Sequence, residues 1–154
     1  MTIRPFRDSD LESVALLFTA SVHSAAADDY DPTQRDAWAP IPPDLDAWRR
    51  RIAPLQTLVA EENSHLAGFI SYEENGHIEF LYTAPAHTRR GVASMLYDGV
   101  ERALRSLGVE ELSTEASLTA RPFFERQGFH VTEEQTVLRR GVSFRRYAMR
   151  KFTL

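Results

Sequence analysis

The sequence predicts a mixed α/β domain, and three observations support that prediction. Apolar residues recur at helical spacing in two long segments, near residues 11–22 and 91–107. Residues 57–83 between them hold short apolar and β-branched runs separated by turn-forming residues. No repeat, linker or low-complexity tract interrupts the 154 residues. We therefore expect a single domain over residues 1–154.

The first third of the chain predicts one short strand followed by helices. Residues 2–6 favour a strand, and Asp8 or Ser9 can cap the helix that follows. Residues 33–39 favour one or two helical turns. Residues 44–52 favour a short helix that ends before Pro54, because proline cannot continue a helix.

From residue 57 onward the spacing of apolar residues predicts three strands, which are followed by alternating helices and strands. Tight turns at 62–64 and 74–76 predict that the strands they join are antiparallel. Gly108 is a typical helix C-cap. The predicted elements are strands at 57–60, 66–72 and 78–83, a helix at 91–107, a strand at 109–116, a helix at 120–127, and a hairpin of 129–137 and 143–152 turning at Arg140-Gly141.

Composition excludes several kinds of chemistry. The chain has no cysteine, so disulfides, thiolate metal sites and a cysteine nucleophile are excluded. Its five histidines show no ligand spacing, and we expect no metal site. No serine lies in a G-x-S-x-G elbow.

The first residues lack an apolar signal run and no segment is apolar enough to span a membrane, so we expect a cytoplasmic protein with no membrane partner.

Charge is distributed unevenly along the chain. Up to residue 84 there are six arginines and 14 acidic residues, and after it 12 basic and eight acidic residues. The second half therefore suits an anionic ligand, whereas the first half slightly favours a cationic one. The C-terminal hairpin is basic, but the net charge of −4 and the absence of interleaved motifs argue against nucleic acid as a partner.

One loop has the features of a phosphate site. Arg89-Arg90-Gly91-Val92-Ala93 lies between the strand at 78–83 and the helix that follows. A helix N-terminus presents unpaired backbone N–H groups and the positive end of the helix dipole. Gly91 lets backbone approach a ligand closely. The alternative is a connecting loop with solvated arginines, and the motif alone leaves both readings open.

In its wider context this loop resembles a known family. The segments Leu81-Tyr82-Thr83 and Arg89–Ser94 are similar to the acetyl-CoA motif of the GCN5-related N-acetyltransferases (GNAT). The segment from Glu115 to Phe129, ending in Gly128-Phe129, is similar to the second cofactor block of that family. Asp29-Tyr30 with Ala37-Trp38-Ala39-Pro40 resembles a small bacterial subgroup of unassigned substrate.

The resemblance implies a fold and a cofactor. The fold is a mostly antiparallel sheet, splayed between the fourth and fifth strands, with helices on both faces; members are often homodimers. The cofactor is acetyl-CoA, used as a co-substrate. Residues at matching positions are expected to bind it: Leu81, Tyr82, Thr83, Arg89, Arg90, Gly91, Val92, Ala93, Ser94, Ser117 and Phe124.

The sequence departs from the family at the position of its usual acid. Members often carry a tyrosine where this chain has Phe124, and a phenyl ring has no proton to give to a leaving thiolate. Ser117 stands where many members have asparagine, and Thr88 where the motif usually opens with glutamine or arginine. The remaining candidate acids are Tyr82, Tyr30 and Tyr147.

Glu79 is the leading candidate for the base that takes a proton from the acceptor amine. Period-two alternation predicts that His77, Glu79, Leu81 and Thr83 share one face, with Tyr82 on the other. Glu115, on the neighbouring strand, is a second candidate. Either glutamate can instead be an ordinary salt-bridged acid.

The expected activity is acetyl transfer to an amine of a small molecule or peptide. The residues expected to contact the acceptor are Tyr30, Trp38 and His77. Alternatively, the two aromatic residues pack in the core and the histidine is solvated in a turn. The rival interpretation is a non-catalytic acyl-CoA-binding module, which Phe124 keeps open.

Overall fold

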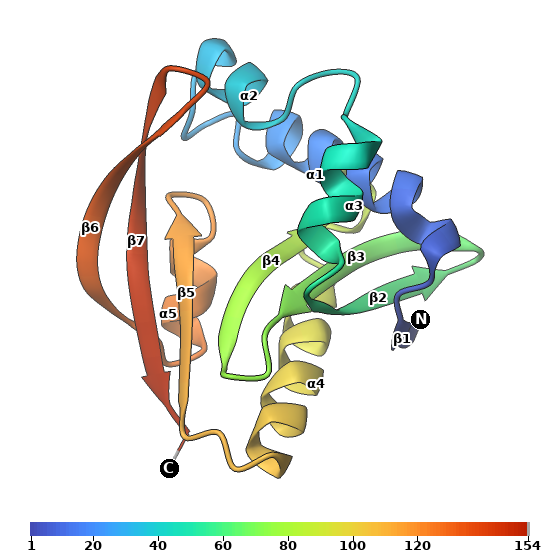
Figure 1. Cartoon of the computed structure of the whole chain (residues 1–154), viewed down its shortest axis with the longest axis vertical. Coiled ribbons are helices and arrows are strands. Elements are labelled where there is room, and N and C mark those ends of the chain that lie inside the picture. The colour runs from blue at the N-terminus through green and yellow to red at the C-terminus, as the bar shows by residue number, and fades with distance from the viewer. Residues whose placement is uncertain (154) are drawn as a thin grey trace.

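The structure is a computed structural model that describes residues 1–153, and it has a seven-stranded mixed sheet with helices on both faces (Figure 1). The strands are β1 (Thr2–Pro5), β2 (Gln56–Glu62), β3 (His65–Tyr72), β4 (His77–Thr83), β5 (Glu111–Ser117), β6 (His130–Arg139) and β7 (Val142–Phe152). The helices are α1 (Leu11–Ala25), α2 (Pro32–Trp38), α3 (Leu45–Ile52), α4 (Val92–Ser106) and α5 (Arg121–Arg126), with 3-10 turns η1 (Asp8–Asp10) and η2 (Pro85–His87). No helix among the described residues is long and apolar enough to cross a membrane.

The strand order confirms the predicted splayed, mostly antiparallel sheet and adds one feature. The order is β1-β2-β3-β4-β5-β7-β6, and only β4 and β5 run parallel. The final hairpin was expected, but its placement was not. β7 lies beside β5 along seven paired residues, so β6 forms the outer edge of the sheet.

One face of the sheet is covered by α4, together with α5. Val92, Leu96, Val100 and Leu104 recur at helical spacing and are almost completely buried against the sheet. The helix begins after Gly91, whose φ of 79° is left-handed, and Gly108 (φ 81°) ends the turn that follows it.

The other face is covered by α1 and α3. Val14, Phe18 and Trp48 pack there against strand residues such as Phe69. Asp10, rather than Asp8 or Ser9, stands at the start of α1. Its carboxylate is occupied by Arg4 and the Arg7 backbone N–H instead of capping the helix.

Gly68 in β3 allows α4 to lie directly on the sheet. A Cβ built there would stand 2.9 Å from the Tyr82 carbonyl oxygen and 2.9 Å from Val92 Cγ1. Both are closer than a carbon atom tolerates, and the first is rigid backbone. The start of α4 can therefore lie this close to β3 and β4 only because residue 68 has no side chain.

We expect Gly68→Ala to lower the free energy of unfolding by about 1–3 kcal/mol, because the added methyl overpacks the start of α4. Gly99→Ala is the matched control. Its Cβ would meet only Leu58 Cδ1 at 3.8 Å, and a helical alanine should stabilise by about 0.5–1 kcal/mol. Urea denaturation measures both, and equal stability of the two variants would contradict the packing argument.

Candidate functional site

The site begins where β4 and β5 separate. These strands pair at only two positions, His77 with Ser113 and Ile78 with Thr114. The Thr114 hydroxyl donates to the Ile78 carbonyl oxygen at 2.9 Å and strengthens the last pair. Beyond it the strands diverge (Figure 1), so the edge of β4 that faces the gap has no strand partner. Glu79 and Glu115 each follow the last pair directly.

An irregularity in β4 changes the faces that its side chains occupy. Ser71 pairs with Phe80 and Tyr72 with Ile78, which leaves Glu79 as an extra residue. Ile78 and Leu81 pack on the α4 face, whereas Phe80 and Tyr82 pack on the α1 face.

The alternation therefore slips by one residue at Glu79. The strict alternation predicted from His77 to Thr83 is therefore interrupted at Glu79, while Leu81 and Tyr82 face opposite sides as predicted. Glu79, Leu81 and Tyr82 all line the same cavity.

The first of two adjoining cavities lies between the end of β4 and the start of α4. We call it the cofactor-side cavity; its volume is about 330 Å³. It is lined by these residues proposed from the sequence: Leu81, Tyr82, Thr83, Arg89, Gly91, Val92, Ala93, Ser94, Ser117 and Phe124. Sequence reasoning missed its other walls, the C-terminal part of α1 and Phe123 and Arg126 of α5.

Arg90 is not among the lining residues. Its guanidinium forms two hydrogen bonds to the Glu62 carboxylate, at 3.1 and 3.2 Å, and a third to His87 Nδ1. The hydrogen bond from Arg90 lowers the pKa of Glu62. The Arg90 side chain therefore fastens the loop to the end of β2, and binding of the cofactor by Arg90 stays a prediction.

The start of α4 points its free donors at the cofactor-side cavity. The first backbone hydrogen bond of the helix runs from Met95 N to the Gly91 carbonyl oxygen at 3.0 Å. The N–H groups of residues 92–94 therefore have no helical acceptor, and these residues line the cavity. Arg89 has a φ of 65°, an unusual conformation for a non-glycine residue that concentrates at ligand-binding loops.

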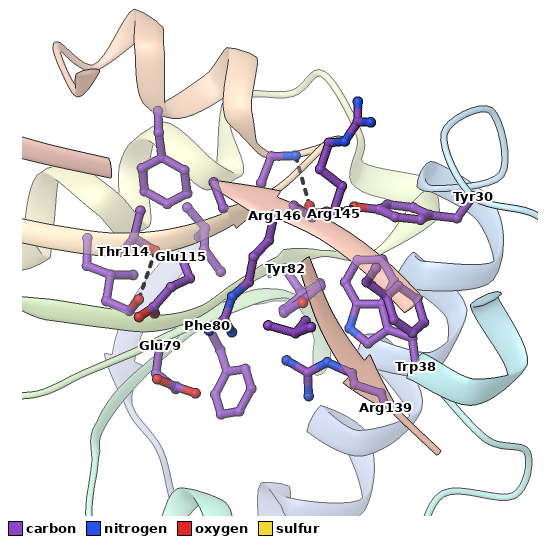
Figure 2. Close-up of a pocket in the computed structure, with 18 of the residues that line it drawn as sticks. Tyr30, Trp38, Glu79, Phe80, Tyr82, Thr114, Glu115, Arg139, Arg145 and Arg146 are labelled. Atoms are coloured by element: carbon purple, nitrogen blue, oxygen red, sulfur yellow. Dashed lines mark hydrogen bonds between the residues drawn. The ribbon is translucent and has the colours of Figure 1, made fainter. Parts of the chain in front are cut away.

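The second cavity, here the acceptor-side cavity, opens between β4, β5 and the β6–β7 hairpin (Figure 2). Tyr30 and Trp38 line it as predicted, with Glu79 and Glu115. The two cavities share a wall made by Trp38, Leu81, Tyr82, Ser117, Ala120 and Phe124. The two cavities are therefore direct neighbours, with these side chains common to both.

His77 does not line the acceptor-side cavity but joins the two glutamates behind it. Its Nε2 lies 2.9 Å from Glu115 Oε2 and 3.4 Å from Glu79 Oε2, while its Nδ1 lies 2.9 Å from Ser113 Oγ. The hydrogen bond to Glu79 raises the pKa of His77 and lowers the pKa of Glu79. His77 was predicted to contact the acceptor; in the structure it lies behind the cavity and supports the carboxylates of Glu79 and Glu115.

The same three side chains offer one ligand atom each within 4.8 Å of one another, the geometry that could hold a cation. Histidine spacing along the chain gave no sign of this cluster, because Glu115 comes from a different strand. A protonated His77 offsets one of the two negative charges and contacts both carboxylates, so ion pairing accounts for the arrangement.

The three candidate tyrosines occupy different environments. Tyr82 lines both cavities, and its burial raises the pKa of its hydroxyl. The Tyr30 hydroxyl donates to the Arg145 carbonyl oxygen at 3.1 Å and accepts from the Leu118 N–H at 2.9 Å, so it connects β7 to the end of β5. Tyr147 is buried in the α4-side core with the Arg121 guanidinium 4.4 Å from its ring.

The hydroxyl of Ser117 has a local role. It accepts a hydrogen bond from the Ala120 N–H at 3.1 Å, which shapes the turn before α5. Phe124 is buried, and its ring faces both cavities. Tyr82 is therefore the candidate hydroxyl that lies at the junction where Phe124 offers none.

Comparison with known proteins agrees with this geometry. A family model described as an acetyltransferase (GNAT) domain matches residues 26–151. The chain is 38% identical over 148 residues to the uncharacterized N-acetyltransferase YafP of Escherichia coli K12, covering 96% of this chain and 93% of that protein.

Solved structures share the fold. A GCN5-related N-acetyltransferase of Rhodopseudomonas palustris has a TM-score of 0.93 at 30% identity, covering 98% of this chain and 94% of that one. The PaiA N-acetyltransferase of Thermoplasma acidophilum, solved with coenzyme A, has a TM-score of 0.75 at 19% identity and covers 99% of both chains. On the family match and the YafP relationship, this chain belongs to the GNAT family of acetyltransferases.

Proposed function

We propose that this chain transfers the acetyl group of acetyl-CoA to an amine directly, without a covalent enzyme intermediate. The observation that carries the proposal is the wall shared by the two cavities, with free helix N–H groups on one side and two carboxylates on the other. The coenzyme A bound to PaiA supports assigning the cofactor-side cavity to that molecule.

The start of α4 suits the phosphates of the cofactor. Backbone N–H groups of residues 92–94 and the Arg89 guanidinium supply donors and positive charge. The free edge of β4 at Leu81–Thr83 supplies backbone groups for the pantetheine arm and the thioester oxygen. Such preorganised donors stabilise the charge that develops on that oxygen during transfer.

Glu79 is positioned to take the proton from the acceptor amine. Its lowered pKa keeps it ionised at neutral pH, and His77 holds the carboxylate in place. The amine nitrogen forms a bond to the acetyl carbon as the carbon–sulfur bond breaks. Tyr82 gives its proton to the departing thiolate as it takes one from water; its raised pKa keeps the hydroxyl protonated but makes it a weak acid, so the two transfers are coupled.

We expect Glu79→Gln to lower kcat/KM at neutral pH by about 10²-fold, because the amide cannot accept the amine proton. Release of the coenzyme A thiol across an amine library measures the effect. Glu115→Gln is the comparison, and the larger loss identifies the base. Tight acetyl-CoA binding by the wild type with no turnover of any amine would instead support the non-catalytic binding module.

We expect Tyr82→Phe to lower kcat by about 10²-fold with little change in KM for acetyl-CoA, because only the acid is lost. Tyr147→Phe is the matched control, since its hydroxyl lies outside both cavities. Adding Phe124→Tyr to the Tyr82→Phe variant should restore activity by returning the hydroxyl that family members often carry. Full activity of Tyr82→Phe alone would exclude this acid.

The ion pairs of His77 should make stability depend on pH. A raised folded-state pKa means that the pairs stabilise fully below the unfolded pKa, near 6.5, and that this contribution is lost as pH rises through the folded value. His77→Gln should therefore lower the melting temperature more at pH 6 than at pH 9.5. An equal loss at both values would contradict a charged His77.

A further inference from the structure

Three arginines line the acceptor-side cavity without a carboxylate partner. They are Arg51 at the end of α3, Arg139 at the end of β6 and Arg146 in β7. Within residues 1–153, no acidic oxygen lies within 4.0 Å of a side-chain nitrogen of any of them. Arg145 of the same hairpin also lines the cavity, but it is paired with Glu134 at 2.9 Å.

Two of the three guanidinium groups, those of Arg51 and Arg146, are held by neutral contacts. Arg51 lies over the rings of Trp48 and Phe80, 4.9 and 4.7 Å from their centroids. Arg146 Nε donates to Gln135 Oε1 at 2.8 Å, which leaves its terminal nitrogens free for a ligand. Figure 2 shows Arg139 and Arg146 extending into the cavity that Glu79 and Tyr82 also enter.

The positive charge of these arginines is only partly offset, because the Glu79 carboxylate that attracts Arg51 and Arg139 is also paired with His77. Partial burial lowers the pKa of Arg51, and repulsion from Arg139 lowers it further, so the two cations lie in one another's field. The two carboxylates at the opposite side, Glu79 and Glu115, are already engaged with His77. An anion between the arginines would relieve the repulsion and form charge-assisted hydrogen bonds.

We propose that the acceptor is an amine that also carries a carboxylate or phosphate group, bound by Arg51, Arg139 and Arg146. The proposal rests on the acetyl transfer proposed above and names its substrate class. Guanidinium groups match planar carboxylates and phosphates through paired N–H donors. Their field also favours the neutral form of an incoming amine, which is the form that attacks the thioester.

This substrate class replaces the cationic acceptor suggested by the acidic first half of the chain. Among the acidic residues up to residue 84, only Glu79 lines the cavity, and its carboxylate is paired with His77. Asp29 accepts from the Thr119 hydroxyl at 2.8 Å, and Asp31 caps α2 by accepting from Gln34 N. Neither lines the cavity, whereas Arg51 from the same half does.

The test compares acceptors that differ only in the anionic group. Amino acids are assayed against their amides, and O-phosphoethanolamine against ethanolamine, at saturating acetyl-CoA. We expect kcat/KM to favour the anionic member of a pair by about 10- to 100-fold, mostly through KM, because the anion contact is made in ground state and transition state alike. The two arms distinguish a carboxylate from a phosphate.

Arg139→Met and Arg146→Met, singly and together, should erase that preference while retaining turnover of the neutral member. Arg145→Met is the matched control, because its partner is Glu134, and it should keep the preference. Equal or better turnover of neutral amines by the wild type, or a preference that survives the double variant, would overturn the proposal while leaving acetyl transfer intact.

A binding measurement separates this inference from the proposed function. Calorimetry with coenzyme A present compares N-acetyl amino acids with their N-acetyl amides for the wild type and the double variant. Tighter binding of the acids that is lost in the variant supports the anion site even if no acceptor is turned over. Equal binding of acids and amides overturns it.

Discussion

The separation of β4 from β5 is the constraint on which the rest of the structure depends. Two residue pairs and one threonine hydroxyl hold the strands together at His77 and Ile78, and beyond them each strand turns to different neighbours. A continuous sheet would close this gap and satisfy the free edge of β4 with another strand. The separation instead leaves backbone donors, two carboxylates and a half-buried tyrosine around the two cavities.

Local patterns predicted the elements well, because periodicity and turn residues act over a few positions. The helix that begins at Val92 and ends at Ser106 follows from its apolar stripe and its flanking glycines. The strand β3 follows from its apolar run and from the turn at Asn63-Ser64, where both residues have positive φ. The loop at Arg89–Ser94, which we propose binds phosphate, is also a local feature, since a strand, a glycine and a helix start suffice to define it.

The features that escaped prediction depend on partners distant in sequence. The slip at Glu79 is set by how β4 pairs with β3, so no pattern within β4 reveals it. The side chain of Arg90 lies in the predicted phosphate loop, but it donates to the Glu62 carboxylate, which is 28 residues earlier in the chain. His77 also meets Glu115 only in the folded chain, because the two residues lie on different strands. Arg51 and the hairpin arginines are likewise distant in sequence and line the same cavity only after folding.

The placement of β6 and β7 divides the site into parts that can change independently. Glu79 and Tyr82, the proposed reacting groups, belong to β4 in the middle of the sheet, where substitution disturbs packing on both faces. Arg139 and Arg146 belong to the C-terminal hairpin, in which β6 forms the edge of the sheet and β7 is paired with β5. Substitutions in that hairpin can therefore change which acceptor binds, while the residues of β4 that carry the proposed chemistry stay the same.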